Sequence, residues 1–314
     1  MINPEIQAFL ADWATAWASL PTGADAKARR AHFELVAQQM REPTPAGVTA
    51  DEEHRIDVPG SDRSVRVRVF RPAAQGIGPR PALIYQHGGA WMQGSPETHW
   101  DITAGLAAAT GYVVISVDYA LSPEQVFPAA VNDGRAVVEW AFAQAAALGL
   151  RADAIFVGGD SAGANLSAAL TLVFRDSPLR LRGALLVYPA VDFSLDRDSH
   201  RENANGPIVM VASMPMVNAM YCPRPEDRLD PRAAPLLAAS HTGLPPAFIA
   251  VAEHDPLRDE GIAYAEALRA AGVAAELDRG PGLIHGYLRA MAWCADSRAA
   301  FDRMGRWLRE VPSR

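Results

Sequence analysis

The sequence predicts an α/β protein with a mostly parallel central sheet and helices on both faces of that sheet. Short, continuously apolar stretches recur between residues 82 and 251, a pattern typical of strands buried on both faces. Helix-like stretches separate these strands, as the crossover connections between parallel strands require. Two earlier stretches alternate between polar and apolar residues, which indicates half-exposed antiparallel strands at the start of the sheet.

Composition and charge argue against several classes of protein. The 314 residues are 49% hydrophobic and 21% charged, near the average for soluble globular proteins. The formal net charge of −7 argues against nucleic acid or an anionic membrane surface as the main partner. No apolar run approaches the length of a membrane span, and the N-terminus lacks the pattern of a secretory signal. We therefore expect a soluble, cytoplasmic protein.

The two cysteines, Cys222 and Cys294, show no CxxC or Cys/His metal-binding spacing. Two free thiols in a reducing compartment are the expectation, and a disulfide between them is the alternative. The sequence predicts no metal and no other cofactor.

The first 45 residues predict two helices. Asn3 can cap the first helix, with Pro4 at its first position, and apolar residues from Ile6 to Leu20 fall on one face. The second helix is expected over residues 24–40, ending before Pro43. Such a stripe indicates packing against the body of the protein or a cover over a pocket, and the two are compatible.

Strands and helices then alternate along the chain. Residues 55–58 and 64–70 are the expected antiparallel strands. Continuously apolar strands are expected at residues 82–85, 112–117, 154–157, 184–187 and 247–251. Helices are expected at residues 98–109, 128–148, 161–175 and 259–272, followed by a strand at 274–279 and a last helix at 287–309.

Residues 193–225 interrupt this alternation. A polar stretch is followed by a cluster of methionines that includes Met210 and Met214. Because methionine is flexible and polarizable, the cluster suggests an adaptable apolar surface over a ligand site. Ordinary filling of a helix interface is the alternative.

A G-x-S-x-G motif occupies residues 159–163. It follows the strand at 154–157 and opens the helix at 161–175, which is the strand–turn–helix setting of a nucleophile elbow. The glycines allow a sharp turn that exposes the Ser161 hydroxyl, and the Ala162 amide at the helix N-terminus can donate to an anion. Ser161 is the candidate nucleophile, and a structural serine in a tight turn is the alternative.

A glycine pair follows the strand at 82–85. Adjacent glycines let the backbone approach a ligand and point its amides at it. This loop and the elbow together predict an oxyanion hole, whose candidate donors are the amides of Gly88, Gly89, Ala90 and Ala162. We expect His87 to organise the loop and Trp91 to pack against it or to wall the pocket.

A serine hydroxyl needs a base, and the base needs an acid that fixes its tautomer. Folds with such an elbow place these groups in the chain order Ser, Asp or Glu, His. His285 lies in a loop at the carboxyl edge of the predicted sheet, where ligands bind, and is the candidate base. His200 and His241 are expected at the surface, and His254 is expected to be a neighbour of the acid.

The acid is expected after the strand at 247–251. Glu253, Asp255, Asp259 and Glu260 are the candidates. Pro256 keeps Asp255 extended at the strand end, whereas capping of the next helix explains Asp259 and Glu260. Asp255 is therefore our choice.

These residues resemble the hormone-sensitive-lipase-like carboxylesterases, the bacterial family IV esterases, in the subgroup with a GDSAG elbow and the α/β-hydrolase fold. The likeness covers about residues 50–310. The motifs that carry it lie at residues 87–91, 118–124, 127–130, 159–163, 188–189, 255–260 and 285–286. The family usually has a third glycine where Ala90 stands, and this leaves open which two loop amides donate.

The resemblance implies Ser161 as nucleophile, Asp255 as acid and His285 as base. It implies a helical cap built from residues 1–45 and 193–225, over a core of residues 46–192 and 226–314. It further implies a carboxylic ester hydrolase for short- to medium-chain acyl esters, in a family whose members are frequently homodimers. An amidase, lactonase or carbamate hydrolase with the same triad is one alternative, and a non-catalytic ligand-binding protein on this fold is another. The candidate pocket walls are Trp13, Trp17, Phe33, Trp91, Met210 and Met214.

Overall fold

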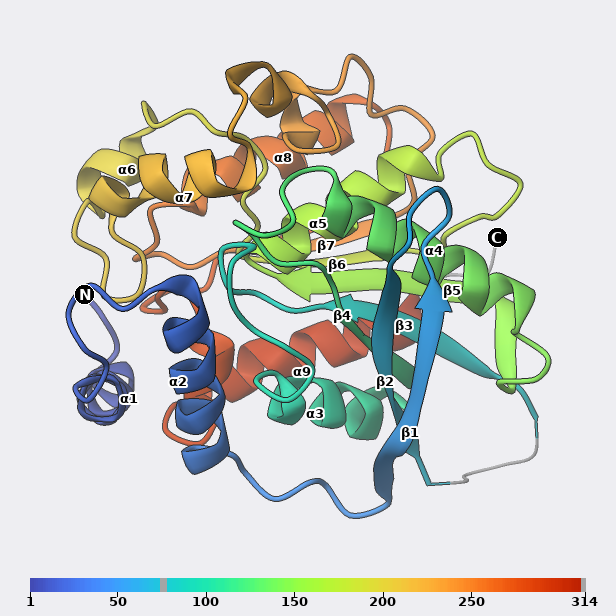
Figure 1. Ribbon diagram of the computed structural model, residues 1–314, viewed down its shortest axis with the longest axis horizontal. Helices are drawn as coiled ribbons and strands as arrows, with labels where there is room; N and C mark the ends of the chain where they lie inside the picture. Colours follow the sequence, from blue (N-terminus) through green and yellow to red (C-terminus); the bar gives the residue numbers. More distant parts are fainter. Residues whose placement is uncertain (74–77, 312–314) are drawn as a thin grey trace.

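An eight-stranded sheet forms the centre of the computed structural model, which describes residues 1–73 and 78–311 (Figure 1). The strands lie in the order β1-β2-β4-β3-β5-β6-β7-β8. Strands β3 to β8 run parallel, and β2 is antiparallel to both β1 and β4. The predicted mostly parallel sheet is confirmed. The strands are β1 (Val48–Asp57), β2 (Ser64–Pro72), β3 (Arg80–Gln86), β4 (Val113–Asp118), β5 (Leu150–Asp160), β6 (Ala184–Val187), β7 (Ala247–Ala250) and β8 (Ala275–Asp278).

Helices cover both faces of the sheet (Figure 1). One layer is α4 (Ala129–Ala143), α5 (Ala162–Val173) and α8 (Arg258–Ala270), and the other is α3 (Trp100–Thr110) and α9 (Ala295–Glu310). Alternate side chains of a strand enter separate apolar cores, so that Ile84 packs with the first layer, and Leu83 and Tyr85 with the second. Burial on both faces explains the continuously apolar strands. No helix within residues 1–73 and 78–311 combines the length and apolar character that crossing a bilayer requires.

Helices α1 (Pro4–Trp17) and α2 (Ala26–Gln39) form the N-terminal segment. Asn3 Oδ1 accepts a hydrogen bond from the Glu5 amide at 2.8 Å, so the first helix begins at the expected cap. Ile6 and Phe9 are fully buried in the core beneath α3 and α9. The apolar stripe of α1 therefore packs against the body of the protein.

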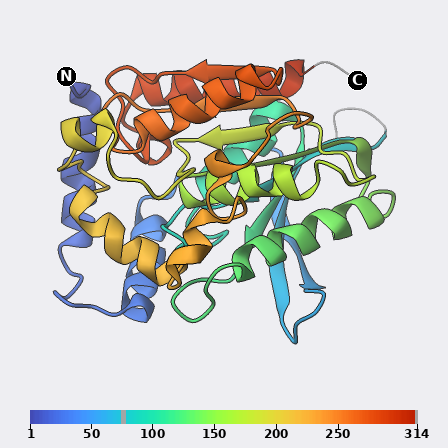
Figure 2. The same ribbon diagram turned by 90° about the horizontal axis from the view of Figure 1, so that it is seen from above.

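The segment 193–225 lies on the same side of the molecule as α1 and α2 in both views (Figures 1 and 2). Its elements are α6 (Asp198–Glu202), the 3₁₀ turn η1 (Val211–Ser213) and α7 (Met214–Tyr221). Ser199 Oγ donates to the Pro256 carbonyl at 2.6 Å, and the Asn203 side-chain amide donates to the Asp255 carbonyl at 3.4 Å. The first part of the segment is thus tied to the loop that follows β7.

The sequence expectations for His200, His241 and Glu260 are wrong, because all three side chains are buried. Glu260 Oε2 accepts hydrogen bonds from the amides of Val191 and Asp192 at 2.9 and 3.2 Å, and its Oε1 lies 3.4 Å from His200 Nε2. Burial raises the pKa of the Glu260 carboxyl. Glu260 therefore anchors the chain after β6 rather than capping α8. Buried polar groups are usually hydrogen-bonded, and the sequence does not reveal partners that come from distant segments.

The last helix is shorter than expected. Residues 287–290 form the 3₁₀ turn η4 (Tyr287–Ala290), and α9 begins only at Ala295, after an extended Cys294 with φ −116° and ψ 120°. Tyr287 and Leu288 are buried, so the turn fills the core before the chain changes direction. Apolar content alone does not distinguish such a turn from a helix.

Both cysteines are free and buried, so the alternative of a disulfide between Cys222 and Cys294 is wrong. Burial raises the pKa of the Cys222 thiol to about 12. The reactive form of a cysteine is the thiolate, which burial disfavours.

We expect neither thiol to react with Ellman's reagent in the folded protein, because both cysteines are buried and the reagent cannot reach them. After unfolding in guanidinium chloride, both thiols should react. The measurement is the absorbance of the released thionitrobenzoate before and after unfolding. Stoichiometric reaction of the native protein within seconds would contradict the burial, and missing thiols after unfolding would indicate a disulfide.

Candidate active site

Ser161 lies at the sharp turn between β5 and α5. Its backbone has φ 55° and ψ −120°, a region that residues other than glycine avoid. The flanking glycines let this turn press against the end of β3. A Cβ on Gly159 would lie 2.2 Å from the Gln86 carbonyl oxygen, and a Cβ on Gly163 would lie 1.9 Å from it. The G-x-S-x-G spacing therefore follows from the close approach of the elbow to β3.

Asp255 and His285 reach Ser161 from two loops at the carboxyl ends of strands. Asp255 follows β7, and His285 lies between β8 and η4. His285 Nε2 is 2.9 Å from Ser161 Oγ, and His285 Nδ1 is 2.8 Å from Asp255 Oδ2. Asp255 is fully buried, and its other oxygen accepts a hydrogen bond from the Leu257 amide at 2.8 Å. A carboxylate at Nδ1 favours the tautomer whose Nε2 can accept the serine proton.

The four expected oxyanion donors differ in availability. The Gly88 amide donates to Asp160 Oδ1 at 3.0 Å, so it is engaged inside the fold and does not fit the prediction. For the amides of Gly89, Ala90 and Ala162, the described part of the chain provides no internal acceptor. These three amides remain free to donate to a ligand.

A buried polar network around Asp160 supports this loop, and sequence reasoning missed it. Asp160 accepts hydrogen bonds from the Tyr85 hydroxyl at 2.8 Å and from the Gly88 amide. Burial by itself raises the pKa of the Asp160 carboxyl, whereas the positive charge of Arg289 and the hydrogen bond from the Tyr85 hydroxyl lower it. The pKa therefore lies below its ordinary value, and Asp160 is a buried carboxylate directly beside Ser161.

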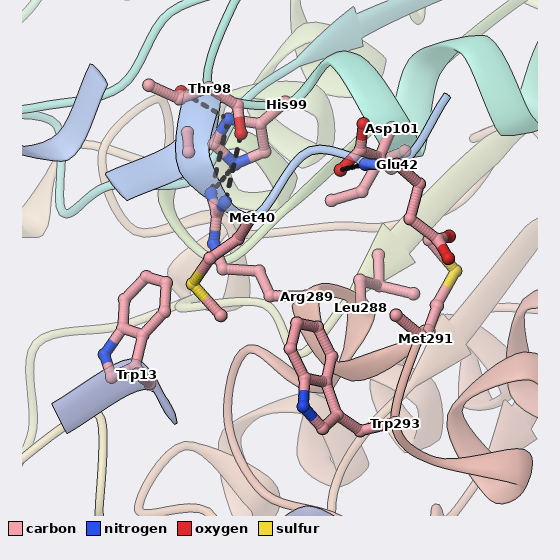
Figure 3. Close-up of a pocket in the computed structure, with 13 residues that line it drawn as sticks. Trp13, Met40, Glu42, Thr98, His99, Asp101, Leu288, Arg289, Met291 and Trp293 are labelled. Atoms are coloured by element: carbon pink, nitrogen blue, oxygen red, sulfur yellow. Dashed lines mark hydrogen bonds between the residues drawn. The ribbon is translucent and has the colours of Figure 1, made fainter. Parts of the chain in front are cut away.

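Arg289 completes this network from the turn η4, four residues after His285. Its Nη2 donates to His99 Nε2 at 2.7 Å and its Nη1 to the Thr98 carbonyl at 3.0 Å (Figure 3). The Gly88 amide also points at His99 Nε2, at 3.2 Å. Because a guanidinium and an amide can only donate, Nε2 carries a lone pair, and burial lowers the pKa of this neutral ring. No motif indicates these contacts, since they join separate segments of the chain.

His87 holds the loop through its backbone and its ring. Burial lowers the pKa of His87 to about 3, so the ring is neutral. It stacks on Tyr119 with ring centroids 4.1 Å apart, and the Tyr119 hydroxyl donates to the His87 carbonyl at 2.7 Å. His99 lies nearby, at 5.4 Å between ring centroids. Among the described residues, no group of three His, Cys, Asp or Glu side chains is arranged to hold a metal ion.

The residues expected to wall the pocket do not gather at one place. Trp13, Trp17 and Phe33 form an aromatic cluster that joins α1 to α2, with ring centroids 5.6 to 6.3 Å apart. Trp13 also lines a small cavity together with Arg289 and Trp293 (Figure 3). Ser161 is not among the residues that line this cavity.

The other three expected wall residues lie at or near segment 193–225. Trp91 is buried and stacks on Tyr221 of α7, so it packs the loop. Met214 packs against the core, as a residue that fills a helix interface does. Met210 is 54% exposed, and its role as a pocket wall stays a prediction.

Comparison with known proteins connects this geometry to a family. Residues 83–289 match the sequence profile of the family described as alpha/beta hydrolase fold. The chain belongs to the α/β-hydrolase fold family. It is 36% identical over 297 residues to the carboxylic ester hydrolase LipN of Mycobacterium tuberculosis, covering 92% of this chain and 77% of LipN. It is 34% identical over 301 residues to an ethyl acetate hydrolase of Pseudomonas putida, covering 92% of each protein.

Solved structures of esterases match this chain over almost its entire length. A hyperthermophilic esterase from the archaeon Pyrobaculum calidifontis has a TM-score of 0.88 and 35% identity, covering 98% of each chain. A thermostable esterase from Pseudomonas putida has a TM-score of 0.91 and 30% identity, covering 99% of this chain and 97% of that one. The chain is a serine carboxylesterase of the hormone-sensitive-lipase-like group, as its motifs indicate.

The strained backbone of Ser161 can be tested through the stability of this esterase. Ser161→Gly and Ser161→Ala both remove the hydroxyl, but only glycine adopts φ 55° without strain. We expect Ser161→Gly to be more stable than Ser161→Ala by about 1 kcal/mol in urea unfolding. Equal unfolding midpoints with equal slopes would contradict strain at this position.

Proposed function

We propose that this esterase cleaves short- to medium-chain acyl esters through an acyl-enzyme, with Ser161 as nucleophile, His285 as general base and Asp255 as the orienting acid. The observation that carries the proposal is the continuous hydrogen-bond chain from the Ser161 hydroxyl through the imidazole to the carboxylate, at 2.9 and 2.8 Å. A serine hydroxyl is a weak nucleophile unless a positioned base takes its proton during attack.

In the first half of the reaction, His285 Nε2 takes the proton of Ser161 as Oγ attacks the ester carbonyl carbon. Asp255 stabilises the imidazolium that forms, and the imidazolium then protonates the leaving alcohol. In the second half, the same base takes a proton from water, which attacks the acyl-enzyme and releases the acid. Ser161 is thereby restored, and all the proton transfers run through one imidazole.

Negative charge develops on the carbonyl oxygen in both halves of the reaction. We assign the Ala162 amide at the start of α5, together with the amides of Gly89 and Ala90, as the donors that stabilise it. Gly88 is left out because its amide donates to Asp160. Loss of one such donor typically lowers turnover by about 10²–10³-fold. Alanine at position 90 keeps the amide that a glycine would supply.

The two helical segments, residues 1–45 and 193–225, form the proposed cap over a core of residues 46–192 and 226–314. Their common position on one side of the molecule supports this division (Figure 2). The similarity to an ethyl acetate hydrolase of Pseudomonas putida supports a small acyl group in the substrate. A homodimer stays a prediction, and so does a cytoplasmic location, which the two free buried thiols favour.

Covalent labelling tests the nucleophile. An ester hydrolase from the metagenome of Lake Arreo, 33% identical with a TM-score of 0.89, is known in complex with a derivative of a bipyridine phosphonate. We expect a reactive phosphonate to label one serine per chain, at Ser161, as measured by mass spectrometry of peptides.

Variants test the same assignment. Ser161→Ala should lose the label, and its turnover should fall by about 10⁴-fold or more. The turnover of Asp255→Asn should fall by about 10⁴-fold. Exposed Ser240 offers the control, and Ser240→Ala should be labelled like the wild type. Labelling elsewhere would overturn the assignment.

A substrate panel tests the reaction class. We expect kcat/KM to be highest for p-nitrophenyl esters with short- to medium-chain acyl groups, to fall for hexadecanoate, and to be far lower for the matching anilides. A higher kcat/KM for anilides, lactones or carbamates would favour the corresponding alternative. Tight ligand binding without turnover would favour a non-catalytic binding protein.

A further inference from the structure

The loop between β3 and α3 has backbone conformations that need support from its surroundings. Ala90 and Trp91 have φ 54° and 56°, and such conformations persist in non-glycine residues only where neighbouring contacts hold them. The loop is also closed on itself, because the amides of Met92 and Gln93 both donate to the Gly89 carbonyl, at 3.1 and 3.0 Å. The contacts made by residues 91 and 92 therefore determine where the amides of Gly89 and Ala90 point.

Arg30 of α2 holds this loop from the N-terminal segment. Its Nε donates to the Met92 carbonyl at 2.7 Å, and its Nη2 donates to the Ser122 carbonyl at 2.7 Å. Glu124 accepts from both terminal nitrogens of the guanidinium, at 2.9 and 2.6 Å. The Ser122 amide in turn donates to the Trp91 carbonyl at 2.9 Å. One planar guanidinium thus fixes residues 91 and 92 against residues 122–124.

Tyr221, the last residue of α7, holds the same loop from segment 193–225. Its ring lies on the Trp91 indole with centroids 4.4 Å apart and planes 3° from parallel. The Phe127 ring packs edge-on against Tyr221, and the Phe127 amide donates to the Tyr221 carbonyl at 2.9 Å. The buried Tyr221 hydroxyl has no hydrogen-bond partner in residues 1–73 and 78–311, so the ring itself makes the contact.

We propose that Arg30 and Tyr221 are positioning residues that couple the cap to the oxyanion hole. One cap segment holds Met92 and the other holds Trp91, so two parts of the chain far apart in sequence meet the loop at adjacent residues. When either helix moves away, the strained loop loses its support, and its amides lose their alignment while Ser161 and His285 stay in place. The inference rests on the proposed function, in which loop amides bind the oxyanion.

Arg30→Met tests the first contact, because methionine keeps the apolar stem and the helix propensity but removes every donor. We expect kcat for p-nitrophenyl butyrate to fall by about tenfold or more, with KM changed less than about threefold, since the displaced donors act in the transition state. Affinity for an alkyl boronic acid, which forms a tetrahedral adduct with the nucleophile, should fall by the same factor. Lys27→Met, at an exposed position of the same helix, is the matched control and should behave as the wild type.

Tyr221→Leu tests the second contact and should give the same pattern of kcat, KM and boronic acid affinity. Tyr221→Phe keeps the stacked ring and should restore kcat to the wild-type value. Circular dichroism establishes that each variant is folded. If Arg30→Met does not fold, Glu124→Gln tests the same contact. This substitution removes the carboxylate that orients the Arg30 guanidinium and leaves the sequence of α2 unchanged. Its kcat should fall in the same direction.

The proposal is overturned if folded Arg30→Met (or Glu124→Gln in its place) and Tyr221→Leu keep wild-type kcat and boronic acid affinity. It is equally overturned if only KM rises, because the cap would then act in substrate binding alone. Failure of the proposed function gives a different result, in which the wild type itself neither turns over esters nor takes a phosphonate label at Ser161.

Discussion

The contact between the turn at Ser161 and the end of β3 is the constraint on which the rest of the site depends. The Gln86 carbonyl occupies the space that a side chain at position 159 or 163 would need. Because β3 is the neighbour of β5 in the sheet, the chain that leaves β3 passes beside this turn at once. The Gly88 amide can then reach Asp160 within hydrogen-bond distance. A single close packing contact therefore brings the nucleophile and the glycine loop together.

One buried charge joins the loops that surround this contact. An unpaired carboxylate in the interior is costly, so Asp160 persists only because hydroxyl and amide donors surround it. Arg289 supplies positive charge nearby, and neutral His99 lies between the two groups. Since Arg289 comes from the turn just after His285, the segment that carries His285 also supports the loop that carries the amides of Gly89 and Ala90. The proposed base and the proposed oxyanion donors are thus linked through buried side chains.

The sequence predicts the features that local spacing or chain order determines. The turn at Ser161 is predictable from the sequence because its glycines lie next to it. Asp255 and His285 are predictable because each follows a predicted strand. The buried partners of Asp160 were not predictable, since Tyr85, His99 and Arg289 come from separate segments. Their polarity similarly led to wrong expectations for His200 and Glu260, which lie side by side in the interior, where Glu260 accepts hydrogen bonds from nearby amides. Side chains whose role depends on distant partners become identifiable only when the fold is known.

The anchoring of residues 199–203 sets the limits of motion in the second helical segment. The side chains of Ser199 and Asn203 donate to the carbonyls of Pro256 and Asp255, on the loop whose Asp255 carboxylate pairs with His285. A swing of the whole segment would pull on that loop and disturb the pairing of the imidazole. The segment is thus held at both ends, at α6 against the loop that follows β7 and at the end of α7 by Tyr221 against Trp91.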